Sequence, residues 1–188
     1  MGLLAIAISA IIVVFLIIIL TSLVIIYNSI ITLRNNIDKA WANIDVLLKQ
    51  RSNEIPNLVS TVKGYMKHEQ QTLESLTKAR SVILESDSRS RKAAMDNLIT
   101  GLLKTVFAVA EDYPDLKAGE NFLKLQKRIS GLENELADRR EFYNDSVTIY
   151  NTRIQSIPDL VVARMMHLST IQLFKATEED KKYVKVNF

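Results

Sequence analysis

Residues 3–26 read LLAIAISAIIVVFLIIILTSLVII, an apolar run in which only Ser9, Thr21 and Ser22 are polar. No charged residue of the chain precedes Arg34. A helix rises about 1.5 Å per residue, so the run spans roughly 36 Å, slightly more than the roughly 30 Å hydrocarbon core of a bilayer. The run therefore predicts a transmembrane helix over residues 1–26, embedded in the lipid bilayer.

A cleavable signal peptide is the alternative interpretation of this run. It requires a charged segment first and then an apolar stretch of about 7–15 residues. Here only Met1 and Gly2 precede a much longer run, so the anchor is the better prediction. Arg34 and Lys39 follow the span. By the positive-inside rule they place the N-terminus outside and the rest of the chain in the cytoplasm.

The remainder of the chain is rich in charge. The 188 residues include 24 Lys and Arg and 21 Asp and Glu, with a net charge of +3. Because the two signs interleave, this composition is typical of a solvated surface and argues against a nucleic-acid-binding protein. The chain has no cysteine, which excludes disulfides and thiolate metal sites.

Beyond the apolar run, apolar residues recur at steps of three and four, and no stretch alternates with the period of a strand. The sequence therefore predicts an all-α protein whose transmembrane helix continues into an antiparallel, coiled-coil-like four-helix bundle over residues 27–158. Pro56, Pro114 and the polar stretch 85–91 mark the helix boundaries. The four bundle helices are expected at about residues 27–55, 57–86, 91–112 and 118–157.

Two charged residues stand out in the predicted bundle. Glu69 falls on the apolar face of the second helix, where a carboxylate must be paired, hydrogen-bonded or partly exposed. Arg139 stands where the rhythm of the fourth helix breaks, which predicts a stutter that locally unwinds a coiled coil. We expect Glu69 and Arg139 to form a buried polar pair that fixes helix register, with Arg80 as the alternative partner. A binding site at Glu69 is the other interpretation.

The segment 159–176 is strongly apolar, with Arg164 and His167 inserted. In an up-down bundle the fourth helix returns towards the membrane. We therefore expect an amphipathic, membrane-proximal segment with Arg164, His167 and Phe174 at the membrane interface. Packing on the base of the bundle or on a neighbouring subunit is the alternative. Residues 177–188 are mostly charged and predict an extended tail.

No sequence motif for catalysis or metal binding is complete. His68-Glu69 begins a zinc-protease helix motif, but Thr72 stands where the second histidine is required. A di-iron bundle needs Glu three residues before histidine, and neither histidine has it. We therefore predict no catalytic residue, no metal and no cofactor. Trp41 and Tyr65 are better explained as packing at an interface than as ligand platforms.

Several stretches of the sequence resemble the LemA family of bacterial membrane proteins. The matching motifs are YN at 27–28, AWANIDV at 40–46, IPNLV at 55–59, VKGY at 62–65, HE at 68–69, AR at 79–80, YPDLKA at 113–118, NF at 121–122, LQ at 125–126, EN at 133–134, and YN at 143–144 and 150–151. The likeness covers almost the whole chain. One departure follows the last helix, where relatives often carry Gly-Phe and this chain has Met166-His167-Leu168.

The resemblance implies a bacterial cell-membrane protein with one N-terminal membrane helix and a helical bundle, and no established reaction. A magnetosome-associated relative suggests a part in organising membranes. We therefore expect a non-enzymatic, single-pass scaffold that forms a homo-oligomer and organises the membrane or membrane-associated proteins. The alternative is a membrane-tethered sensor or partner-binding module that regulates another, unidentified protein.

Overall fold

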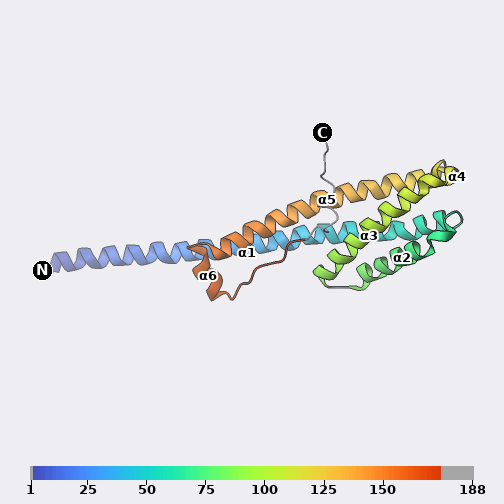
Figure 1. Cartoon of the computed structure of the whole chain (residues 1–188). Coiled ribbons are helices and arrows are strands. Elements are labelled where there is room, and N and C mark those ends of the chain that lie inside the picture. The colour runs from blue at the N-terminus through green and yellow to red at the C-terminus, as the bar shows by residue number, and fades with distance from the viewer. Residues whose placement is uncertain (1, 175–188) are drawn as a thin grey trace, which may run out of the picture. The chain divides into compact units, whose positions relative to one another are not determined.

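The computed structural model describes residues 2–174 (Figure 1). Within this range the chain is all-α, as predicted, and has no strand. The α-helices are α1 (Gly2–Val62), α2 (Gln70–Glu85), α3 (Arg89–Val109), α4 (Pro114–Lys117), α5 (Glu120–Gln155) and α6 (Asp159–Met165). Two short 3-10 helices, η1 (Lys67–Glu69) and η2 (Ala110–Asp112), precede α2 and follow α3. The predicted tail lies outside the described residues.

The described chain divides into two compact units, to which α1 and α5 both contribute. The stem unit comprises residues 2–40 and 143–173, and the bundle unit comprises residues 41–142 together with Phe174. In the bundle unit, parts of α1 and α5 join α2 and α3 to make the four helices of the predicted bundle, and α2 packs against α3. Each unit has its own buried apolar core.

Helix α1 continues through Pro56 to Val62, so the predicted helix boundary at Pro56 is wrong. Proline has no amide hydrogen and leaves the carbonyl four residues earlier without its helical donor. In α1 that carbonyl belongs to Ser52, and Arg80 of α2 donates from its Nε to it at 2.8 Å. The side chain of Arg80 therefore replaces the missing amide, and the helix does not have to end.

The second helix accordingly begins later than expected, at Gln70 instead of residue 57. Leu58 and Val62, which the sequence analysis placed in that helix, are fully buried residues of α1. They continue, in steps of three and four, the buried positions Ile44, Leu48, Arg51 and Ile55. The phase of this stripe passes unchanged through the proline, which is the sequence signal for one uninterrupted helix.

Helix α3 begins where the polar stretch predicted it. The side chain of Ser88 accepts a hydrogen bond from the backbone amide of Arg91, which is an N-cap of the kind that the Ser- and Asp-rich stretch 85–91 predicts. The apolar spacing predicts that this helix buries Met95, Leu98, Leu102, Val106 and Val109. The observed buried face is different, because Leu98 is exposed. The residues that α3 buries are Lys92, Asp96, Ile99, Leu103 and Val106.

Helix α5 has no stutter at Arg139, so that prediction is wrong. The inward positions of the helix run through Ile129, Glu133, Leu136, Arg140 and Tyr143 in steps of four and three. Two of these inward residues are charged. An analysis that counts only apolar residues therefore finds a break where the spacing is in fact regular.

The segment after α5 is only partly helical. Helix α6 covers seven residues, Asp159–Met165, and residues 168–174 have no regular structure. Ile157, the expected last residue of the fourth helix, is 82% exposed, because α5 ends at Gln155. Among the described residues two helical stretches, Ile6–Val62 and Arg89–Asp112, are long and apolar enough to cross a membrane. The second carries buried charges of the bundle core, whereas the apolar part of the first is bare and compatible with a membrane anchor.

Candidate functional site

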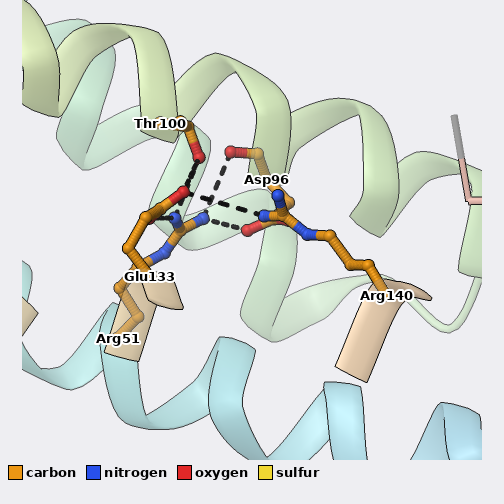
Figure 2. Close-up of polar contacts among 5 residues, drawn as sticks. All are labelled: Arg51, Asp96, Thr100, Glu133 and Arg140. Carbon is orange, nitrogen blue, oxygen red and sulfur yellow. Dashed lines mark hydrogen bonds and ion pairs between the residues drawn. The ribbon is translucent and has the colours of Figure 1, made fainter. Parts of the chain in front are cut away.

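A network of charged side chains lies inside the bundle unit (Figure 2). Its centre is Arg51 of α1, whose side chain is 1% exposed. The guanidinium forms ion pairs with Asp96 of α3 and Glu133 of α5. It also donates to the hydroxyl of Thr100 at 3.0 Å and to the backbone carbonyl of Asp96 at 3.1 Å. One side chain therefore joins three helices.

Arg140 of α5 closes the network from the other side. It forms an ion pair with the second carboxylate oxygen of Asp96 and lies 4.0 Å from Glu133. Thr100 donates to Glu133 at 2.6 Å. Two guanidinium groups thus face two carboxylates, so the network is neutral overall, as a buried cluster of charges must be.

Asp96 is the most buried carboxylate of the network, with its side chain at 0% exposure. Burial raises the pKa of Asp96, while the charges of Arg51 and Arg140 act in the opposite direction. Because the carboxylate contacts both guanidinium groups, removing either arginine would leave a charge in the core without full compensation.

Further ion pairs link α1 to its neighbours along the bundle unit. Lys92 of α3, itself 8% exposed, pairs with Asp45 of α1, which also pairs with Lys49 at 2.8 Å. Burial opposes ionisation of Asp45, but the hydrogen bonds from both lysines outweigh it and lower its pKa. These contacts tie the register of α1 to that of α3 at a second level.

The structure does not bring Glu69 and Arg139 together, so the predicted buried pair is wrong. Glu69 lies half-buried in η1, at the turn that leads into α2. Arg139 is half-exposed on α5 and forms its ion pair with Glu135 of the same helix at 3.7 Å. The buried arginine of α5 is its neighbour Arg140, and the expected register-fixing role of a polar core belongs to the network around Arg51.

Trp41 and Tyr65, the predicted interface residues, have different environments. Trp41 is half-buried and packs against the ring of Phe174, with 6.1 Å between ring centroids. The guanidinium of Arg89 lies 5.5 Å from the Trp41 ring, in reach of a cation–π contact. Tyr65 is 46% exposed in the turn after α1. Trp41 therefore takes part in packing within the chain.

The three predicted membrane-interfacial residues also separate. Arg164 and His167 are exposed at the end of α6. Phe174 is 5% exposed, between Trp41 and Arg140, whose guanidinium lies 5.0 Å from its ring. Phe174 is therefore a core residue of the bundle unit and not a membrane-facing one, because the Trp41 ring and the Arg140 guanidinium already pack against its ring.

In the stem unit, side chains of α5 hold the backbone of the C-terminal segment. Asn151 donates to the carbonyl of Ile171 at 2.9 Å and accepts from the amide of the same residue at 2.9 Å. Tyr143 donates to the carbonyl of Gln172 at 3.2 Å. These contacts explain both YN motifs in part, since Tyr143 and Asn151 supply the donors and acceptor that an extended segment otherwise finds in a sheet.

The network can stabilise the bundle and fix the register of its helices. Its charged groups form ion pairs with one another. Among the described residues no group of His, Asp and Glu could hold a metal ion. Sequence analysis missed Arg51, Asp96, Glu133 and Arg140 because it looked for apolar residues at inward positions. Their spacing from buried neighbours, by three or four, is the signal that could have found them.

Comparison with known proteins agrees with the motifs quoted above. A model of the LemA family matches residues 40–188. Protein LemA of Metamycoplasma hominis is 30% identical over 138 residues, which are 71% of this chain and 61% of that relative. The chain thus aligns with less than two thirds of the relative's length. Because the family match covers most of the sequence, the chain belongs to the LemA family.

Proposed function

We propose that this chain is a non-enzymatic, membrane-anchored scaffold that self-associates and organises the membrane or proteins bound to it. The observation that carries the proposal is the bare apolar start of α1, where Leu4, Phe15 and Leu20 are each more than 60% exposed. Apolar surface on this scale, unbroken by charge, is stable in a bilayer and not in water. The charges of Arg34 and Lys39 favour a cytoplasmic bundle.

Self-association is supported by the way α1 is shared between the units. The same helix supplies the apolar anchor and a core helix of the bundle unit. Confining anchors to a plane raises their effective concentration, so weak contacts between copies suffice for assembly. The ion network supports a scaffold role further, because buried polar contacts of this kind fix one register of the helices.

The test counts copies in a membrane. Because the chain has no cysteine, a Ser90→Cys variant accepts a single fluorophore at an exposed position. Labelled full chains in lipid vesicles, at falling protein density, should bleach in more than one step per particle. An excess of unlabelled chain should reduce the number of steps. Single-step bleaching at every density would overturn self-association.

A second function, partner binding, is favoured by a groove of about 650 Å³ on the surface of the bundle unit. Val59 and Met66 and, from α2, Leu73 form its apolar lining. Its charged lining residues are Lys63, Lys78 and Glu74, and the carboxylate of Glu74 accepts a hydrogen bond from Gln70 at 2.7 Å. Within residues 2–174 neither lysine has an ion-pair partner. We propose that the groove takes an amphipathic helix with acidic flanks, since its apolar face would fill the groove and its carboxylates would pair with the lysines.

The charge preference of the groove can be measured with two designed helical peptides. Both carry leucine on one face, and their flanks are either glutamate or lysine. The full chain should bind the acidic peptide, and Lys63→Glu with Lys78→Glu should invert the preference. The matched control, Lys124→Glu with Lys127→Glu on α5, should leave it unchanged. Equal binding of both peptides, or none, would overturn this function.

A further inference from the structure

Helix α6 has an apolar face that the chain leaves bare. Its buried side carries Asp159, Val162 and Ala163, each at 6% exposure or less. The opposite side presents large apolar residues at steps of four, Val161 at 54% and Met165 at 72% exposure. A seven-residue helix with apolar side chains on both sides is expected to contact something other than water on its outer side.

The stem unit places this face near the end of the apolar run of α1. In this unit α1 and α5 run antiparallel (Figure 1). Tyr150 on α5 lies near Arg34 on α1. Burial raises the pKa of Tyr150, and the positive charge of Arg34 acts in the opposite direction. One turn further, Ile154 and Ile30 are both buried, at 5% and 0% exposure.

Helix α5 ends at Gln155, one residue after Ile154. Ile26, the last residue of the apolar run, lies four residues from Ile30, which is about 6 Å along α1. Helix α6 follows after only three residues. The bare face of α6 therefore lies at the level where α1 changes from an apolar to a polar helix, which is where the surface of a bilayer would be.

Local contacts fix the direction of α6. Arg153 at the end of α5 forms an ion pair with Asp159 in the first turn of α6. At the other end, Leu168 donates to the carbonyl of Ala163 and His167 to that of Arg164, the two hydrogen bonds of a Schellman motif. A helix this short is held in place by such contacts and not by its own stability.

We propose that α6 lies in the bilayer interface, with Val161 and Met165 among the lipid chains and Arg164 at the headgroups. The inference rests on the proposed membrane anchoring and adds a second, peripheral contact with the same membrane. The exposed guanidinium of Arg164 next to the apolar face is the arrangement in which a long cationic side chain reaches anionic headgroups. The experiment distinguishes this lipid contact from the alternative, in which a second copy of the chain covers the apolar face of α6.

The test uses an environment-sensitive fluorophore on single cysteines of the otherwise cysteine-free full chain. Val161→Cys carries the probe on the bare face, and Leu123→Cys on α5 is the matched control, because Leu123 is similarly exposed at 47%. Each is reconstituted at one copy per nanodisc, in phosphatidylcholine and phosphatidylglycerol with or without spin-labelled lipid. The probe at residue 161 should shift to the blue and lose intensity to the spin-labelled lipid, and the control should do neither.

Each other outcome counts against the proposal. A probe at residue 161 with the spectrum of the control shows that the face is in water. A blue shift without quenching by spin-labelled lipid shows that protein covers the face. In both cases the chain still enters the nanodisc, so membrane anchoring stands. Failure of the unlabelled chain to enter nanodiscs overturns the anchoring and this inference together.

Discussion

At the scale of single residues, three positions each complete a backbone or charge requirement that the chain cannot meet otherwise. Arg80 supplies the donor that Pro56 lacks, so α1 passes through a proline. His167 has a φ of 52°, the left-handed conformation that closes the Schellman motif of α6. Asp45 balances two lysines at the contact between α1 and α3. Each makes a separate prediction.

Arg80→Met should destabilise the bundle by about 1–3 kcal/mol, because the carbonyl of Ser52 would be left without a donor. Pro56→Ala restores the backbone amide that the carbonyl normally receives within a helix. In the Pro56→Ala background the loss on Arg80→Met should therefore shrink to the packing of the side chain alone. Urea unfolding of the four proteins in the cycle measures this coupling, and equal losses in both backgrounds would contradict the explanation.

His167→Gly should stabilise the protein by about 0.5–1 kcal/mol, because glycine adopts a positive φ without a steric penalty. The matched control is Met166→Gly, since Met166 has a φ of −85° in the helical region and should lose stability on the same change. Thermal unfolding of both variants tests the opposite signs.

The pH dependence of Asp45 follows from its lowered pKa. A carboxyl with a folded pKa below the ordinary value of 3.8 stabilises the fold above that value, and the contribution is lost as the pH falls through the folded pKa. The free-energy difference between the native chain and Asp45→Asn should therefore be largest near neutral pH and vanish in acid. Urea titrations across this range decide the matter.

At the scale of helices, the sequence predicted the existence and order of the long helices well. It predicted less well which face of each helix is buried. The number and order of the long helices follow from the three-and-four spacing of apolar residues. The errors fall where charged residues take inward positions: Asp96 on α3, and Glu133 and Arg140 on α5. When only apolar residues are counted, a helix face that carries such inward charged residues is mistaken for a solvent-exposed face. Their partners lie on other helices, so no single segment shows that the charges are paired.

Removing one charge of the network should reduce stability more than replacing all four charged residues by apolar ones. Arg51→Met alone should cost about 3–5 kcal/mol, because Asp96 and Glu133 would keep charges in the core. Adding Asp96→Leu, Glu133→Leu and Arg140→Met should recover most of that loss, since apolar residues of similar size fill the space. The control Arg139→Met should change stability by less than about 0.5 kcal/mol. A quadruple variant no more stable than Arg51→Met would contradict this view.

At the scale of the whole molecule, the apolar run and the bundle could be predicted from the sequence, but the return of the C-terminal segment could not. Residues 168–174 carry no periodic pattern, and their placement depends on side chains of α5 such as Tyr143 and Asn151. The burial of Phe174 against Trp41 likewise joins residues far apart in the chain. Such contacts are set by tertiary structure, which local spacing does not encode.

The anchor makes the prediction on which the proposed function depends. The native chain should stay with membranes through washes at about 1 M salt, because its attachment is apolar and not ionic. Ile12→Arg with Ile18→Arg should release a large fraction, since each arginine at the centre of a span costs about 2.5–3.5 kcal/mol of insertion free energy. Asn35→Arg with Asn36→Arg adds the same charge beyond the apolar run and should leave the chain in the membrane. Centrifugation and immunoblotting of each fraction measure the distribution. Release of the native chain by salt alone would mean that the first part of α1 is covered by protein, and both the anchoring and the self-association proposed for this chain would then have to be abandoned.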